Sequence, residues 1–185
     1  MNAKQNSRTH TTTIAKANIF ALAIMLPVAT VFIVPYLLLW PVEPIVDGID
    51  QMLLWFIPVL IIGTIMHELI HGLTWAIFAN RGFRSIKFGI KWSMITPYCH
   101  CKEPLKKQHY LLGALTPMIF LGIIPGIIAI VLGNPFWLLF GIFFTWAAGG
   151  DILGAIMLQK VKKHEWVADH PEMLGFEVVD EPNHQ

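Results

Sequence analysis

The sequence predicts an all-α membrane protein with four transmembrane helices and a short cytoplasmic-side β-hairpin between the second and third. An apolar composition, four long apolar runs and the sorting of basic residues support this class. Hydrophobic residues make up 55% of the 185 residues and charged residues 14%, whereas soluble domains average roughly 25% charged residues. So few polar side chains could not cover the surface of a free-standing soluble domain.

Each of the four apolar runs is long enough to cross a bilayer, which takes about 20 helical residues. The runs are residues 14–40, 52–79, 110–132 and 135–158. The first exceeds the roughly 7–15 apolar residues of a signal peptide and lacks a small-x-small cleavage site after it, so we expect it to remain as a membrane helix. Residues 1–185 are expected to form one membrane-embedded domain, with 160–185 as a cytosolic tail.

The basic residues predict the orientation in the membrane. All 13 Lys and Arg lie within residues 1–17, 80–109 and 160–163, and the alternate loops 41–51 and 133–134 contain none. By the positive-inside rule, both termini are cytoplasmic and the protein is a multi-pass component of the cell (inner) membrane, surrounded by lipid. The net charge of +1 indicates no nucleic-acid partner.

The loop between the second and third runs has the pattern of a hairpin. Residues 85–92 alternate polar and apolar side chains, which is strand periodicity, and a second short strand is expected at 94–101. The two cysteines, Cys99 and Cys101, are too close in sequence for an unstrained disulfide. We therefore expect no disulfide framework.

The strongest local signal is His67-Glu68-Leu69-Ile70-His71, the pattern H-E-x-x-H, within the second run. Helical residues four apart share a face, so both imidazoles can bind one cation, and zinc is the usual partner of such a pair. In metallopeptidases with this spacing the Glu is the general base and not a ligand. Ionisable groups at membrane depth cost roughly 2.5–3.5 kcal/mol and mark functional sites. The alternative is that these residues only form interhelical hydrogen bonds.

Two imidazoles leave a tetrahedral zinc short of a protein ligand. The candidates are Cys99, His100, Cys101, Glu103, His109 and Asp151. Depth favours Asp151, because His67 and Asp151 lie about 15 and 16 residues from the outer ends of their runs, or roughly 22–24 Å from the outer face. Asp151 could instead cap a helix after Gly149-Gly150 or pair with an imidazole.

Two further groups of residues have both a structural and a functional interpretation. On a strand, Cys99 and Cys101 share a face and His100 points away, which is poor geometry for one metal. A soft metal could still bind the cysteines with other residues, but we expect hairpin packing. Thr116-Pro117 predicts a kink, with Thr116 reaching the site as the alternative.

Together these residues resemble the site-2 protease class of intramembrane zinc metallopeptidases, and more closely the small bacterial membrane proteins described as putative zincin peptidases. The matching stretches, within roughly residues 50–180, are His67-Glu68-Leu69-Ile70-His71-Gly72, Cys101-Lys102-Glu103-Pro104-Leu105 and Gly150-Asp151-Ile152. The resemblance implies that His67, His71 and Asp151 bind Zn²⁺ and that Glu68 is the catalytic base. Around Asp151 the chain departs from the Asn-Pro-Asp-Gly of site-2 proteases.

The sequence therefore predicts an intramembrane zinc-dependent metalloprotease that hydrolyses peptide bonds near the cytoplasmic membrane face, with a peptide or membrane protein as substrate. A catalytically silent metal-binding scaffold and, after it, a metal transporter are the alternatives. Glu68 favours the enzyme, because a binding module needs no carboxylate beside the first His. The transporter is disfavoured because the polar residues cluster at one depth. The donor set also accepts metals other than zinc, and the sequence names neither the substrate nor the oligomeric state.

Overall fold

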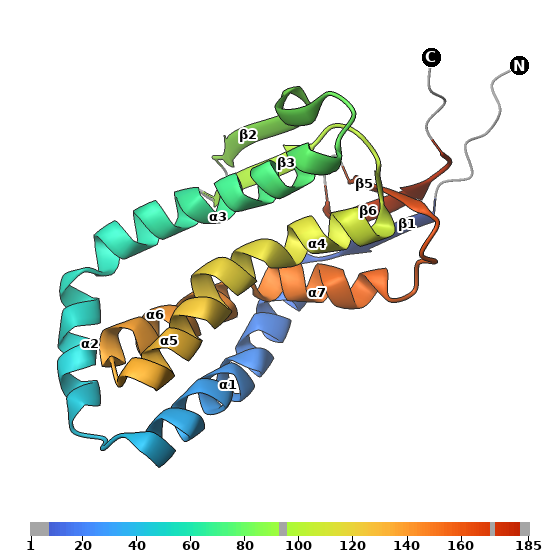
Figure 1. Cartoon of the computed structure of the whole chain (residues 1–185). Helices are drawn as coiled ribbons and strands as arrows, with labels where there is room; N and C mark the ends of the chain where they lie inside the picture. The colour runs from blue at the N-terminus through green and yellow to red at the C-terminus, as the bar shows by residue number, and fades with distance from the viewer. Residues whose placement is uncertain (1–7, 93–95, 171–172, 182–185) are drawn as a thin grey trace, which may run out of the picture. The chain divides into compact units, whose positions relative to one another are not determined.

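The computed structural model describes residues 8–92, 96–170 and 173–181, and this part of the chain is mostly helical with two small antiparallel sheets (Figure 1). The predicted helical class is confirmed in this form. One sheet is the predicted hairpin. The other was not predicted, so the all-α description is incomplete.

The helices follow the predicted runs with two interruptions, except that α2 occupies most of the loop expected at 41–51. In the described residues they are α1 (Ile14–Leu39), α2 (Pro44–Leu54), α3 (Phe56–Phe78), α4 (Lys107–Pro117), α5 (Ile124–Leu132), α6 (Pro135–Ala147) and α7 (Gly149–Leu158). A π-helical segment, Met118–Ile123, joins α4 to α5, and a 3₁₀ turn, Gly82–Ser85, follows α3. The run expected at 52–79 is divided at Trp55, because Pro58 has no N–H for the carbonyl of Leu54. The run expected at 135–158 is broken at Ala148.

Three helical stretches are long and apolar enough to cross a membrane: Ile14–Leu39, Phe56–Phe78 and Lys107–Leu132. The bent pair α6 and α7 makes a fourth if it counts as one span. These helices expose large apolar side chains, such as Leu26 at 72% and Leu38 at 80% in α1. Contiguous exposed apolar surface is unfavourable in water but not in lipid. The helices are therefore consistent with a multi-pass membrane protein.

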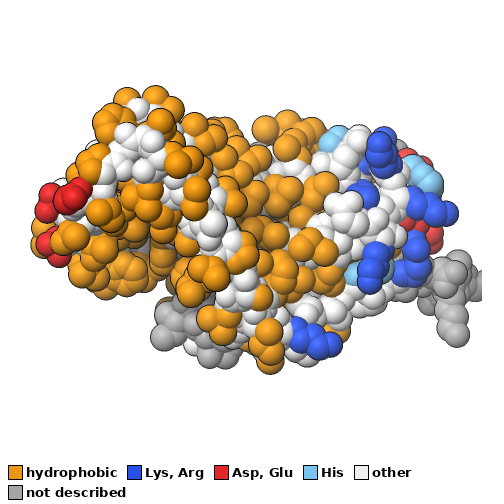
Figure 2. Space-filling view, turned by 90° about the horizontal axis from the view of Figure 1, so that it is seen from below, with side chains coloured by type: hydrophobic (Ala, Val, Ile, Leu, Met, Phe, Trp, Pro, Cys, Tyr) orange, Lys and Arg blue, Asp and Glu red, His pale blue; other side chains and the backbone are white. Residues whose placement is uncertain are grey.

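The chain folds into two compact units. Unit 1 comprises Met1–Ala17, Glu68–Thr116 and Asp151–Gln185, and unit 2 comprises Asn18–His67 and Pro117–Gly150. All 13 Lys and Arg belong to the segments of unit 1. In Figure 2, apolar side chains cover most of the visible helical surface, whereas Lys and Arg side chains gather over unit 1. The basic residues that are sorted along the sequence are thus also confined to one of the two units.

Unit 2 is a helical unit with close helix contacts. Tyr36 of α1 is fully buried, and its hydroxyl donates a hydrogen bond to the Gly133 carbonyl at 3.0 Å. Gly133 ends α5 with a φ of 68°, the left-handed conformation that favours glycine. A Cβ on Gly141 of α6 would lie 2.7 Å from Gly126 of α5, so glycine is needed where these helices meet.

Unit 1 contains a four-stranded antiparallel sheet. Its strand order is β1 (Arg8–Thr12), β6 (Leu174–Val179), β5 (Trp166–Asp169) and β4 (Leu105–Lys106). β1 pairs with β6 from Arg8↔Val178 to Thr12↔Leu174, so strands from opposite ends of the chain lie side by side (Figure 1). Part of the tail expected at 160–185 therefore belongs to this sheet.

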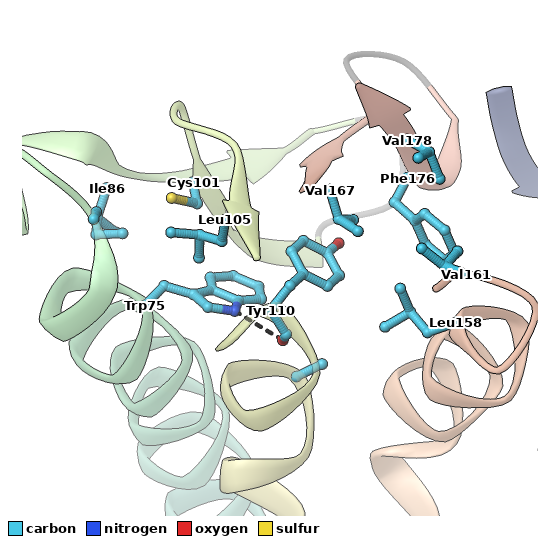
Figure 3. Packing of buried hydrophobic residues seen from close by; sticks show 12 residues of the cluster. Trp75, Ile86, Cys101, Leu105, Tyr110, Leu158, Val161, Val167, Phe176 and Val178 are labelled. Carbon is cyan, nitrogen blue, oxygen red and sulfur yellow. Dashed lines mark hydrogen bonds between the residues drawn. The ribbon is translucent and has the colours of Figure 1, made fainter. Parts of the chain in front are cut away.

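A buried apolar cluster packs the sheet of unit 1 against α3, α4 and α7. Trp75, Tyr110 and Leu158 come from the helices, and Val167 and Phe176 from the sheet (Figure 3). The Trp75 Nε1–H donates to the Tyr110 carbonyl at 3.1 Å, which connects α3 to α4. Trp75 lies on α3 about two helical turns after His67, so the cluster positions the helix that carries the H-E-x-x-H motif.

The predicted hairpin is formed by β2 (Ile86–Lys91) and β3 (Thr96–Cys101), paired antiparallel from Ile86↔Cys101 to Lys91↔Thr96. The second strand was expected at 94–101, of which 94 and 95 lie outside the described residues. The apolar face of the hairpin lies on α3. A Cβ on Gly72 would lie 2.4 Å from the Phe88 ring and 3.0 Å from Ile86, so a larger residue would separate the hairpin from the helix.

Candidate metal centre

Helix α3 carries His67, Glu68 and His71. His67 and His71 lie one helical turn apart and therefore on one face. His71 is buried, whereas His67 and Glu68 are half-buried. Trp75, one further turn along, stacks on the His71 imidazole with ring centroids 5.1 Å apart. The motif thus lies inside a continuous helix, with an aromatic side chain fixing the second imidazole.

Asp151 lies in the first turn of α7, which begins at Gly149 after the break at Ala148. The helix dipole favours a carboxylate at such an N-terminus. Asp151 Oδ1 lies 3.4 Å from His71 Nε2. The ligand atoms of His67, His71 and Asp151 all lie within 4.8 Å of one another. The structure therefore brings together the three residues proposed as ligands.

The separation of 3.4 Å between Asp151 Oδ1 and His71 Nε2 is an ion-pair distance, and it is also compatible with two ligands of one cation. A charge-assisted N–H···O hydrogen bond is about 2.7–2.9 Å long, which is shorter than the 3.4 Å observed. Two ligands held at about 2.0–2.1 Å by a tetrahedral zinc lie roughly 3.3–3.4 Å apart. Two imidazoles and one carboxylate are also a donor set of catalytic zinc sites. The residues present therefore fit zinc.

The other ring nitrogen of His71 has a backbone partner. His71 Nδ1 lies 2.8 Å from the carbonyl oxygen of Gly113 on α4. A carbonyl can only accept a hydrogen bond, so Nδ1 carries the proton and donates it. The neutral imidazole then has its lone pair on Nε2, on the side of Asp151. Metal-binding histidines are commonly fixed in this way.

Glu68 lies beside the ligand group without belonging to it. Burial raises the pKa of the Cys99 thiol on β3, and the negative charge of Glu68 raises it further. That influence indicates that the Glu68 carboxylate lies near the hairpin strand. The role of Glu68 as general base stays a prediction from the H-E-x-x-H pattern.

The cysteines of β3 have packing roles. Cys101 belongs to the buried cluster of Figure 3, and the partly buried Cys99 packs against that cluster. Burial raises the pKa of Cys101 to about 11. His100 is on the opposite face of β3. Its Nδ1 lies 3.2 Å from Asp169 Oδ2, which also accepts the Cys101 N–H at 2.8 Å. These contacts agree with the expected hairpin packing.

Two candidates on α4 also have other partners. His109 stacks on Phe78 with ring centroids 4.1 Å apart. The Thr116 hydroxyl donates to the Leu112 carbonyl at 2.5 Å, a bond within its own helix. Over residues 8–92, 96–170 and 173–181, the three ligands proposed above form the one group of His, Cys and acidic residues that could hold a metal.

Glu103 anchors the turn after α3 to the hairpin. Its carboxylate accepts hydrogen bonds from the Asn80 N–H at 2.8 Å, Arg81 Nε at 2.7 Å and Ser85 Oγ at 2.6 Å. Burial alone would raise the pKa of Glu103, but these donors outweigh it and lower the pKa. The Cys101 thiol donates to the Glu103 carbonyl at 3.3 Å. The Cys101-Lys102-Glu103 stretch therefore has a structural explanation.

Several residues around the site were not predicted. The Tyr110 hydroxyl donates to Asp169 Oδ1 at 2.5 Å, and this bond ties α4 to β5. Trp75 contacts both His71 and Tyr110. The partners in the Trp75 and Tyr110 hydrogen bonds are 35 and 59 residues apart. No short-range pattern reveals such pairs, because periodicity reports only on neighbours within one element.

A protein family described as "Putative zincin peptidase" matches residues 60–166 of the chain. This stretch covers more than half of the sequence and includes His67, Glu68, His71 and Asp151. The chain belongs to this family. Membership of the zincin family indicates a zinc peptidase and agrees with the donor group described above. Searches among curated proteins and among solved structures found no match.

The zincin-family match covers only part of the described fold. It begins within α3, includes the hairpin and α4 to α7, and ends at Trp166, the first residue of β5. Helices α1 and α2 and strands β1 and β6 lie outside it. The family region is therefore the part of the chain that contains every residue proposed for metal binding and catalysis.

Proposed function

We propose that this chain is an intramembrane zinc-dependent metalloprotease of the site-2 protease type, which hydrolyses peptide bonds near the cytoplasmic membrane face. The observation that carries the proposal is the convergence of the His67, His71 and Asp151 ligand atoms within 4.8 Å. Two of these residues lie on α3, which is long and apolar enough to cross a membrane. The sorting of the basic residues supports cytoplasmic termini in the cell (inner) membrane.

His67, His71 and Asp151 would hold the ion, and Glu68 would move the proton. Bound zinc supplies Lewis acidity, which lowers the pKa of water from about 15.7 toward about 7 and polarises the scissile carbonyl. Glu68 accepts a proton from the water as its oxygen bonds to the carbonyl carbon. Glu68 then returns that proton to the amine nitrogen as the C–N bond breaks. One water and one peptide bond are consumed, so the step balances without another reactant.

A substrate within the membrane has to expose its backbone. Helical peptide groups are hydrogen-bonded to one another and protected from attack. Among the described strands, β2 pairs with β3 alone, and its other edge can receive an extended segment. The Lys102 N–H donates to the Ser85 carbonyl at 2.8 Å. Residues 85 and 102 are therefore a hydrogen-bonded pair, and such pairs alternate with non-hydrogen-bonded pairs along the ladder. Phe88 and Ile90 belong to non-hydrogen-bonded pairs, so their N–H groups point to the outer edge of β2.

Replacing Ile90 with Pro is expected to reduce peptide cleavage at least about tenfold, because it removes one outward donor and displaces the substrate. The β2–β3 ladder should survive, since Ile90 faces Pro97 in a pair that exchanges no hydrogen bonds. The measurement is the cleavage rate of a model transmembrane peptide, together with bound zinc. Ile90→Ala is the matched control, because it shortens the side chain and keeps the N–H. Equal rates in the two variants would exclude the hairpin edge from the mechanism.

The proposed function is tested on the purified full-length chain by measuring bound zinc and cleavage of a model transmembrane peptide in the same samples. We expect a chelator to remove both zinc and cleavage, and added zinc to restore both. Chelator saturated with zinc beforehand is the control and should have no effect. Zinc binding without cleavage of any tested peptide would favour the silent scaffold. Zinc uptake into vesicles containing the protein would favour the transporter.

A further inference from the structure

The carbonyl that holds His71 belongs to an unusual helix position. In an α-helix, the carbonyl of residue 113 accepts the N–H of residue 117. Residue 117 is Pro, which has no N–H to donate. The Gly113 carbonyl of α4 therefore lacks its normal helical donor, although backbone carbonyls in buried positions are strong acceptors that require a partner.

His71 supplies a donor for this carbonyl. Its Nδ1 lies 2.8 Å from the Gly113 oxygen, and both residues are buried. This hydrogen bond therefore does not compete with the N–H that residue 117 would contribute in a regular α-helix. The pairing fixes the Nδ1–H tautomer and directs the Nε2 lone pair toward Asp151, 3.4 Å away.

The absence of a side chain at Gly113 is also required. A Cβ on Gly113 would lie 2.0 Å from Trp75 Nε1, which is far inside contact distance. Trp75 occupies this space while stacking on His71 and donating to the Tyr110 carbonyl at 3.1 Å. Glycine at 113 thus admits the indole that holds the imidazole ring, and its carbonyl holds the Nδ1 edge of the same ring.

We propose that Gly113 and Pro117 are positioning residues for His71. Pro117 removes the i+4 N–H that would otherwise compete for the Gly113 carbonyl, and that carbonyl presents Nε2 of His71 for metal binding. The inference rests on the proposed role of His71 as a ligand. A proline in a membrane helix usually produces a kink. Here we assign Pro117 a second role, which is to position His71 through the Gly113 carbonyl.

Replacing Pro117 with Ala tests this assignment, because it restores an N–H that competes for the Gly113 carbonyl. We expect the Kd for zinc to rise at least about tenfold, the lower end of the effect of removing a partner of a metal-binding histidine. In ¹⁵N NMR of histidine-labelled protein, the His71 signal should move away from the pure Nδ1–H tautomer. Circular dichroism should show unchanged or higher helix content, so the loss would not reflect unfolding.

Pro125→Ala is the matched control, because Pro125 lies in the same helical stretch and its missing N–H concerns carbonyls after the Gly113 carbonyl. This variant should keep the wild-type zinc Kd and His71 tautomer. Gly113→Ala provides a second test, and it should also weaken zinc binding by displacing Trp75. Wild-type zinc affinity and an unchanged His71 tautomer in Pro117→Ala would overturn the proposal.

Failure of this inference can be separated from failure of the proposed protease function, since neither readout uses a substrate. A wild-type protein that binds zinc but cleaves nothing contradicts the protease alone and leaves the positioning test valid. A wild-type protein that binds no zinc contradicts the metal site and this inference together.

Discussion

Replacing Glu68 with Gln is expected to lower peptide cleavage by about 10²–10⁴-fold, the usual contribution of a general acid–base group. Gln is close to Glu in size and keeps hydrogen-bonding capacity, but it cannot take a proton from water. Because Glu68 lies outside the His67, His71 and Asp151 group, bound zinc should remain at the wild-type level. The measurement pairs the cleavage rate with the zinc content of the same preparation.

Glu177→Gln provides the matched control for Glu68→Gln. Glu177 is a half-buried carboxylate of the same unit, on β6, where its Oε1 lies 3.6 Å from His170 Nε2. The control removes the same charge away from the proposed ligands and should cleave at the wild-type rate. A Glu68→Gln protein that retains zinc and cleaves as fast as wild type would show that Glu68 is not the base.

Replacing Asp151 with Ala is expected to weaken zinc binding by more than about 100-fold and to abolish cleavage. Removing a group that merely supports a ligand costs 10–100-fold in metal affinity, and loss of a ligand itself should cost more. The substitution also removes the carboxylate from the first turn of α7, where the effect on helix stability is modest. Zinc titration of the purified variant measures the effect.

Asp180→Ala, at an exposed position after β6, is the control for Asp151→Ala and should bind zinc normally. Wild-type zinc affinity in Asp151→Ala would leave Asp151 only as an electrostatic partner of His71. Asp151→Asn refines the comparison, because an amide keeps the size of the side chain while losing the negative charge that favours a cation.

The parts of the site that depend on local geometry could be predicted from the sequence. His67 and His71 share a face because the helix repeat is known, and the strand alternation of residues 85–92 predicted the hairpin that packs on α3. Residue counts from the outer ends of the runs placed Asp151 at the depth of His67. The count remained useful although the helix is broken at Ala148, because a break changes direction more than it changes the rise along the chain.

The surroundings of the site could not be predicted, because they depend on contacts between distant segments. β1 is short and polar, β6 is a six-residue strand near the other end of the chain, and their pairing brings together segments more than 160 residues apart. Strand formation of this kind depends on cross-strand neighbours more than on intrinsic preference. Pro117 was interpreted only as part of a kink, because the sequence alone does not reveal that His71 is the donor to Gly113.

The sheet of unit 1 also constrains how often the chain can pass through a bilayer. A membrane cannot run between hydrogen-bonded strands, so β1, β4, β5 and β6 all lie on the same side of it. Any segment that leaves one of these strands and returns to another must therefore make an even number of passages. If Lys107–Leu132, a candidate span between β4 and β5, makes one passage, the broken pair α6 and α7 must make the return. Under that condition, the pairing of the strands requires an even number of spans, where length and composition alone leave three or four.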